Sequence, residues 1–446
     1  MAAQSTLSSL PPALVQRILA LLPVDARARA STVCRSWRDA LADARLWTRL
    51  DLSDASSVTC RLSARVLLAA AARAHGTLQA LDVCRADEAF RSEAVLQVVQ
   101  ANKDMLRELR AGFCTVDDDD DDEHTLIPWL HAAPELRVLS ANVCCSLEQA
   151  PALLRNEPPY GRLQLRQLFV EMPDDDDNFL AEDVNEWVLA LAEALPAHAS
   201  LRSLIFLLSH LESEAAFDAL VNAVLAARPP CALPLLELRS CNLPPTSTSS
   251  LARLLGGGTL TQLRLIDCPA LLNEAPSVAV LAAALHANST LKTLYLTNGD
   301  LWTRVHRPGI VLLGALTGHF SLQSLNLRAK KSVSDQEAEV GDALGALVAA
   351  NARALTHLDV SGCEMRDAAL GPLCDALPHN THLRSLDVSS NDFSAAFAAE
   401  RLLPAVRAND SLRWLRVAGY NGMPALDEAV DLVSARAAAA MAAAEN

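Results

Sequence analysis

Apolar residues recur along most of this chain in the spacing L-x-x-L-x-L, and each copy is followed by a stretch with helical apolar periodicity. Successive copies begin 27 to 36 residues apart, about 30 on average. Residues 355–365 and 383–393 are the clearest copies, and residues 278–288 are typical of the helical stretches. A short strand alternating with a helix at a fixed period indicates a repeat protein. The copies begin at Trp47, Leu78, Leu106, Leu136, Leu165, Leu201, Leu233, Leu260, Leu291, Leu322, Leu355, Leu383 and Leu412.

One such repeat cannot fold alone, because its few buried apolar side chains do not offset the entropy lost when about thirty residues are ordered. The repeats must stack and share their apolar faces. We therefore expect an α/β solenoid, a horseshoe with a parallel sheet on the concave face and helices outside. The length and helical character of residues 47–430 resemble leucine-rich repeats of the ribonuclease-inhibitor type. That resemblance concerns the fold and leaves the function open.

Residues 10–52 differ in kind from the rest of the chain. Prolines at the start, an apolar stripe through Leu14, Ile18 and Leu22, and further apolar residues up to Trp47 predict three short helices. Roughly forty residues cannot bury all of these side chains among themselves. We expect the surplus apolar face to contact a partner.

The N-terminal stretch resembles an F-box in its Leu10-Pro11 pair, its Val33-Cys34 and Trp37 segment, and its Leu46-Trp47 pair. Such a unit implies binding to a Skp-type adaptor and, through it, to a cullin of a ubiquitin ligase. The residues expected to contact the adaptor are Leu10, Pro11, Leu14, Ile18, Leu19, Val33, Cys34, Trp37, Leu46 and Trp47. The alternative is that these helices only cap the solenoid, since terminal repeats need a cap.

These patterns predict three parts. Residues 1–50 form the F-box-like unit, residues 51–430 form the solenoid, and residues 431–446 form a C-terminal helical cap or tail. The end of the chain is rich in alanine, which favours a helix.

The net charge of −15 is unevenly distributed, because residues 117–123 and 174–177 contribute eleven acids. We read these runs either as solvated loops or as a guide for a basic client. The acidic balance argues against nucleic acid as a ligand. The sequence shows no signal peptide and no apolar run approaching 18 residues, so we expect a cytoplasmic or nuclear protein without a membrane contact.

Five of the eleven cysteines lie eight residues after a repeat start, where such repeats turn an Asn or Cys inward. We interpret them as reduced structural thiols, and we expect no metal, no cofactor and no enzymatic activity. No phosphate-binding loop, G-x-S-x-G or H-E-x-x-H motif is present in the sequence. These cysteines are Cys114, Cys144, Cys241, Cys268 and Cys363.

Side chains between the leucines of each strand should point out of the concave sheet, where a protein client would bind. Phe169, Ile205 and Leu207 would form one apolar spot, unless a register shifted by one residue turns Ile205 and Leu207 into the core. The expected client contacts are Phe169, Ile205, Leu207, Arg264, Tyr295 and Trp414.

Three functions fit these observations. The first is the substrate-recognition subunit of an SCF-type cullin-RING ubiquitin ligase, and the second is a non-enzymatic scaffold or inhibitor whose N-terminal helices act as a cap. The third is a regulator of a small GTPase, which ranks last because no exposed catalytic loop is recognisable. The exposure of Leu10, Pro11, Ile18 and Trp47 should distinguish the first from the second.

Overall fold

The computed structural model describes residues 12–22, 24–51, 64–83, 92–115, 138–146, 150–155, 167–171, 181–197, 201–207, 211–226, 233–297, 301–302, 307–328, 337–419 and 422–444. The chain divides into two compact units, Met1–Val170 and Glu171–Asn446. Both acidic runs lie outside the described residues.

The first unit begins with short helices and continues with parallel strands β1 to β4, each paired with the next. Helix α1 contacts α2, α3 and a 3-10 turn at Ala44–Trp47, and the turn contacts α4. The elements are α1 Pro12–Ala20, α2 Val24–Ala30, α3 Arg35–Ala40, β1 Arg49–Asp51, α4 Ala64–Arg73, β2 Ala80–Asp82, α5 Ser92–Ala101, β3 Glu108–Thr115, β4 Val138–Ser146 and α7 Ala150–Leu154. Strand β5, Gln167–Glu171, lies at the boundary between the units.

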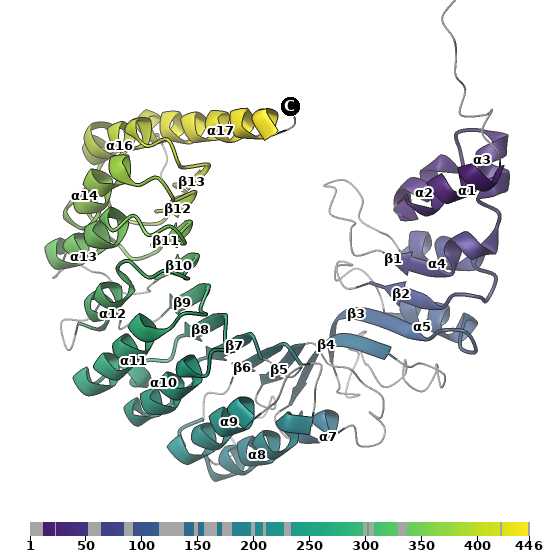
Figure 1. The fold of residues 1–446 in the computed structure, drawn as a ribbon, viewed down its shortest axis with the longest axis horizontal. Coiled ribbons are helices and arrows are strands. Elements are labelled where there is room, and N and C mark those ends of the chain that lie inside the picture. The colour runs from purple at the N-terminus through teal and green to yellow at the C-terminus, as the bar shows by residue number, and fades with distance from the viewer. Residues whose placement is uncertain are drawn as a thin grey trace, which may run out of the picture. The chain divides into compact units, whose positions relative to one another are not determined.

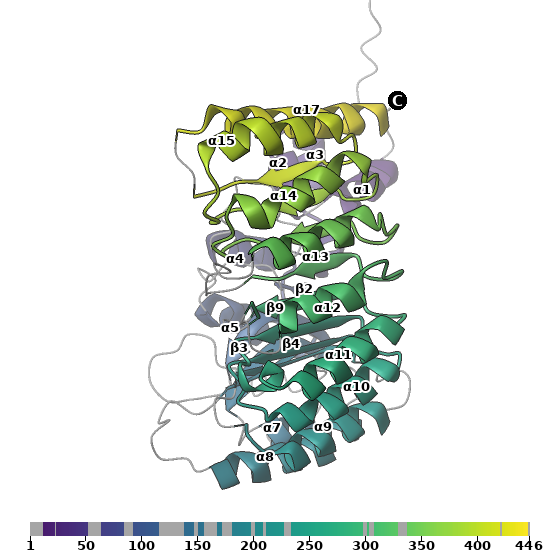
Figure 2. The same ribbon diagram turned by 90° about the vertical axis from the view of Figure 1, so that its left-hand side faces the viewer.

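The second unit alternates helix and strand, and its strands β6 to β13 pair in parallel in sequence order. Within this unit the strands line one side and the helices the other (Figure 1). Figure 2 shows the same helices stacked one above the next. The strands are β6 Ser203–Leu207, β7 Leu235–Arg239, β8 Gln262–Ile266, β9 Thr293–Thr297, β10 Ser324–Asn326, β11 His357–Asp359, β12 Ser385–Asp387 and β13 Trp414–Arg416. The helices are α8 Ala181–Ala194, α9 Glu214–Ala226, α10 Thr248–Gly256, α11 Ala275–Ala287, α12 Pro308–Leu316, α13 Glu337–Ala349, α14 Asp367–Ala376, α15 Ala395–Phe397, α16 Leu403–Ala408 and α17 Pro424–Ala444.

Each of these thirteen strands begins two residues after the predicted repeat start, so the expected α/β solenoid and its register are confirmed. The leucines of the pattern are buried and form the core between sheet and helices, as Leu263, Leu265 and Leu294 illustrate. The predicted part boundaries stay a prediction, and the one between residues 430 and 431 falls inside α17.

The inward cysteine slot is confirmed where the side chains are described. The thiol of Cys363 donates to the carbonyl of Leu327 in the preceding repeat at 3.2 Å. Cys241 and Cys268 are buried and likewise bond to backbone carbonyls. Asn391 fills the slot in its own repeat and donates to Val360 O at 3.0 Å. These side chains satisfy carbonyls at the bend after each strand, where the backbone ladder ends.

Candidate functional site

Trp47 and Leu19 form the core of the N-terminal helices, because neither exposes any surface. The indole Nε1 of Trp47 donates to the carbonyl of Leu41 at 2.8 Å. The guanidinium of Arg73 on α4 lies 4.8 Å from the centroid of the indole ring. Both side chains are thus covered within the chain itself, Trp47 in part by Arg73 of α4, and their contact with an adaptor stays a prediction.

The N-terminal helices also carry exposed apolar side chains. Leu14 and Ile18 on α1 are 42% and 37% exposed, and Leu21 directly after α1 is 86% exposed. Val33, just before α3, is 66% exposed. Helix α1 is amphipathic, so Val15 and Leu19 pack inward, while Leu14 and Ile18, each one residue earlier, lie on a neighbouring face that is exposed to solvent. We call Leu14, Ile18, Leu21 and Val33 the α1 apolar set.

The remaining predicted adaptor contacts are intermediate or outside the described residues. Cys34, Trp37 and Leu46 are partly exposed. Leu10 and Pro11 lie outside the residues that the structure describes. The exposure of these residues was expected to distinguish a partner-binding unit from a cap. The exposed Ile18 favours a partner-binding unit, whereas the packed Trp47 favours a cap.

Arg27 holds the N-terminal helices together from within. Its Nε donates to the carbonyl of Leu22 at 2.7 Å, and its Nη1 donates to the carbonyl of Leu46. Burial lowers the pKa of this guanidinium from its ordinary value. The two bonds tie the end of α1 to the 3-10 turn, which fixes the positions of the exposed residues of α1.

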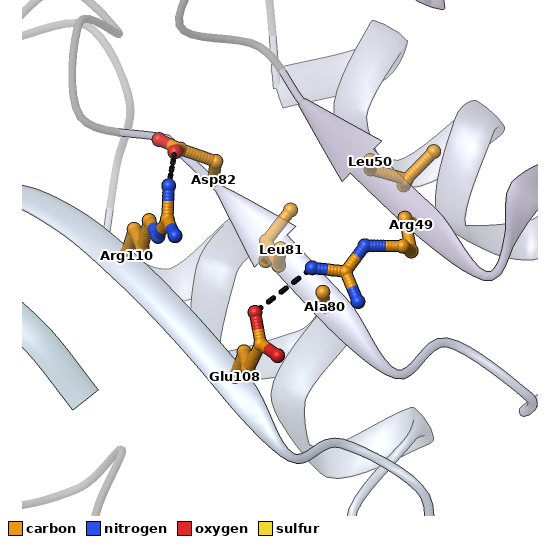
Figure 3. Close-up of a pocket in the computed structure, with 7 residues that line it drawn as sticks. All are labelled: Arg49, Leu50, Ala80, Leu81, Asp82, Glu108 and Arg110. Carbon is orange, nitrogen blue, oxygen red and sulfur yellow. Dashed lines mark hydrogen bonds and ion pairs between the residues drawn. The ribbon is translucent and has the colours of Figure 1, made fainter. Parts of the chain in front are cut away.

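A small hollow lies on the outward sheet face of the first unit, over β1, β2 and β3 (Figure 3). It forms because Ala80 on β2 is short, while Arg49 and Glu108 on the flanking strands reach across and pair at 2.9 Å. Arg110 and Asp82 form a second pair at 3.5 Å. Its volume of about 80 Å³ holds only a few water molecules, at about 30 Å³ of liquid each. These charged groups are already paired, so the hollow is a feature of the surface rather than a ligand pocket.

The outward face of the second unit carries the other predicted positions. Ile205, Glu237, Arg264 and Tyr295 occupy one register position on β6 to β9. The shifted register is thereby excluded, since Leu204 and Phe206 lie in the core. Ile205 is nevertheless only 7% exposed, so its neighbours cover it and the expectation of an open contact there is wrong.

The other predicted client contacts keep some surface. Leu207 is 36% and Trp414 is 47% exposed. Arg264 and Tyr295 are partly exposed and stacked, with the guanidinium 4.7 Å from the ring centroid. Phe169 is partly exposed on β5, within the first unit. Leu207, Arg264, Tyr295 and Trp414 thus remain available as contacts on the second unit.

Glu237 is a residue of this surface that was not among the predicted client contacts. Its carboxylate is completely buried, and it pairs with Arg239 on the same strand and with Arg264 on β8. Aligning the repeats could have revealed this pair of contacts. Arg239 follows Glu237 by two residues on β7, and Arg264 occupies the same register position as Glu237 on β8.

Among the residues that the structure describes, no group of three or more His, Cys, Asp or Glu side chains is arranged to hold a metal ion. No helix within the described ranges combines the length and apolar character needed to cross a bilayer.

Comparison with known proteins supports the two-part organisation. Residues 7–53 match the F-box-like family, and residues 352–374 and 379–396 match the leucine-rich-repeat family. No curated protein matches the chain.

Two solved structures illustrate what the fold is similar to. The crystal structure of the Rad7 and Elc1 complex in yeast matches at 18% identity with a TM-score of 0.34, covering 63% of this chain and 69% of the other. The leucine-rich repeat-containing protein LegL7 from Legionella pneumophila matches at 16% identity with a TM-score of 0.34, covering 74% of this chain and 95% of the other. From the family matches and the geometry above, the chain carries an F-box-like domain at its N-terminus and leucine-rich repeats after it.

Proposed function

We propose that this chain is the substrate-recognition subunit of an SCF-type cullin-RING ubiquitin ligase. Its F-box-like unit binds a Skp-type adaptor, which connects it to a cullin, and its repeats bind a client protein. The proposal rests on the F-box-like match over residues 7–53 together with the leucine-rich repeats.

The observation that carries the proposal is the α1 apolar set. Leu14, Ile18, Leu21 and Val33 are exposed, whereas Val15 and Leu19 on α1 are packed. Taking a fully exposed side chain of this size out of water is worth about 1.5 to 3 kcal/mol, and a partner gains the share that corresponds to the area still exposed. While the side chains of the α1 apolar set are exposed, they do not stabilise the free unit. A partner that covers them would gain the free energy of removing their apolar surface from water.

In this function the chain performs no chemistry of its own. It holds the client near the ligase so that the transfer of ubiquitin becomes effectively intramolecular. The client side belongs to the outward sheet face, where Trp414 and Leu207 offer exposed apolar area.

Co-elution on size-exclusion chromatography tests the proposal, using the full chain with a purified Skp-type adaptor and a cullin. We expect a ternary complex with the wild-type chain and none with Ile18→Glu. Leu189→Glu, at a comparably exposed apolar position on α8, serves as the control and should still assemble. A folded wild-type chain that elutes alone contradicts the proposal.

Point variants are preferable to deletion of residues 1–50. Such a deletion removes Trp47 and Leu50, which are both buried, and it strips Arg73 on α4 of its aromatic partner. Lost binding would then reflect unfolding of the first unit as well as a lost surface.

The second candidate is a binding scaffold whose N-terminal helices only cap the repeats. The packing of Trp47 against Arg73 on α4 favours it, because a cap needs that contact. A cap alone gives no reason for the exposure of Leu14 and Ile18. Under this reading Ile18→Glu and the wild type behave alike with the adaptor.

A further inference from the structure

The exposed stripe of α1 contains a cation among its apolar side chains. Leu14, Arg17, Ile18 and Leu21 follow one another at positions i, i+3, i+4 and i+7, so they line one side of the helix and of the turn that follows it. All four side chains are exposed. The same spacing is typical of the anchor residues of a helix that binds in a groove of its partner. In such a complex Arg17 lies inside the interface rather than at its rim.

Arg17 has no counter-charge in the free chain. Its guanidinium forms no hydrogen bond or ion pair within the described residues. No acidic residue precedes Asp25 in the sequence. Asp43 contacts α1, but it does so by accepting a hydrogen bond from Gln16 at 3.3 Å. Successive residues are about 100° apart around a helix, so Gln16 and Asp43 lie on a different side of α1 from Ile18.

The N-terminal helices are basic, although the chain as a whole is acidic. Residues 1–50 contain seven arginines and three aspartates, which give them a net charge of +4, whereas the rest of the chain carries −19. Arg49 pairs with Glu108 on β3, and the balance of residues 1–50 stays positive when Arg49 is discounted. A partner surface with negative charge is therefore attracted to this part of the chain and repelled by the remainder.

We propose that Arg17 pairs with a carboxylate of the Skp-type adaptor, set in the apolar groove that receives Leu14, Ile18 and Leu21. A cation in the middle of an apolar interface must be neutralised, because an unpaired charge is costly to bury. An adaptor whose groove lacks an Asp or Glu at this point is rejected, which makes Arg17 a determinant of specificity. This inference rests on the proposed function and gives the chemistry of the partner at the same site.

A purely structural role of Arg17 makes different predictions. Arg17 lies in the last turn of α1, where a cation stabilises a helix through the helix dipole. This stabilisation is already present in the free chain. Its loss would lower the stability of the first unit, but it would not change how the affinity for the adaptor depends on salt.

Equilibrium titration of the full chain with a purified Skp-type adaptor tests the ion pair. At low salt, Arg17→Gln should bind about tenfold and Arg17→Glu about a hundredfold more weakly than the wild type, whereas Arg17→Lys should stay within about threefold. The difference between the wild type and Arg17→Gln should shrink at high salt, because salt screens the pair. Thermal melting checks the folding of each variant. Arg353→Glu is the matched control and should bind like the wild type, because Arg353 is an exposed arginine of the second unit that also has no partner within the described residues.

Carbodiimide cross-linking of the same complex locates the carboxylate. Lys103 is the first lysine of the sequence, so Arg17→Lys introduces a single side-chain amine into residues 1–102. A carboxylate that the carbodiimide activates beside this amine forms an amide bond with it, and the urea leaves. We expect mass spectrometry to find position 17 joined to an Asp or Glu of the adaptor. The control Arg353→Lys should give no product that joins position 353 to the adaptor.

The outcomes separate this inference from the proposed function. An assembled complex without the cross-link at position 17 overturns the inference and leaves the adaptor-binding function standing. The same holds if folded Arg17→Glu binds as tightly as the wild type at low salt. A folded wild-type chain that binds no adaptor overturns both.

Discussion

The imidazole of His319 accepts a hydrogen bond from the backbone N–H of Leu322, with Nδ1 and N 3.1 Å apart. Its Nε2 donates to the carbonyl of Leu285 in the preceding repeat at 3.1 Å. Asn288, Asn380 and Asn409 make the same two kinds of bond in other repeats, each three residues before the repeat start. His319 therefore replaces an asparagine and must stay neutral to do so.

The stability of the second unit should fall as the pH drops below about 6.5, the pKa of an unfolded histidine. Burial, followed by the nearby charge of His286, lowers the pKa of His319 in the folded state. The unfolded chain therefore binds the proton first, and stability is lost by up to about 1.4 kcal/mol per pH unit until the folded state is protonated too. Hydrogen exchange of residues 308–328 at pH 7.5 and pH 5.5 measures this loss.

His319→Asn is the control for the pH effect, because it keeps both bonds and removes the titration. We expect the variant to be as stable as the wild type at pH 7.5 and more stable at pH 5.5. An equal pH dependence in both chains contradicts the role of His319.

Glu237→Gln should destabilise the second unit by about 3 kcal/mol, because it leaves two paired arginines without their buried counter-charge. Asp392→Asn is the matched control, since Asp392 pairs with Arg366 at 3.2 Å with both side chains more than half exposed. Exposed pairs contribute about 0 to 1 kcal/mol. Urea unfolding monitors both variants, and equal losses would show that the burial of Glu237 has no energetic consequence.

Gly345→Ala should destabilise the packing of α13 on α14. An added Cβ would lie 2.7 Å from Cβ of Pro372 and 3.0 Å from its backbone carbonyl, so the helices must separate. We expect a loss of about 1 to 3 kcal/mol. Gly314→Ala on α12 meets nothing within 4 Å and should stabilise by about 0.5 to 1 kcal/mol. Thermal melting distinguishes the two signs, and a stabilised Gly345→Ala would contradict the close helix contact.

Trp47→Phe should lower the stability of the first unit. Molecules of the variant that remain folded should bind the adaptor as tightly as the wild type. The variant loses the hydrogen bond to Leu41 and part of the contact with Arg73, which together are worth about 1 to 3 kcal/mol. Proteolysis of the first unit measures the loss. Weaker adaptor binding at unchanged stability would instead make Trp47 a direct contact.

The strand register could be predicted from the sequence because a side-chain period of two ties every leucine to one face. The spacing of the leucines could not show which side chains on the outward face are exposed and which are covered by their neighbours. Ile205 stands at an outward position and is covered, whereas Trp414 at an outward position of the last strand is open. Exposure depends on the size of the neighbours on adjacent strands, which one strand's pattern does not contain.

The N-terminal unit was predicted as three helices with a surplus apolar face, and both features are present in the described residues. Leu14, Ile18 and Val33 of that face were predicted, but Leu21 was missed and the burial of Trp47 was not foreseen. Trp47 has an indole N–H that finds the carbonyl of Leu41, and two arginines lie near its ring, so the largest aromatic is drawn into the core. Leu21 and Val33 lie at helix ends, where the described part of the chain leaves most of their surface exposed.

Equilibrium titration of the full chain with a purified Skp-type adaptor tests the central claim most directly. We predict a Kd of about 1 μM or tighter for the wild type, and a loss of at least about a hundredfold for the double variant Leu14→Glu, Ile18→Glu. Val280→Glu, at a comparably exposed position on α11, should bind like the wild type. No binding by the folded wild-type chain, or equal affinity of the double variant, would contradict the account.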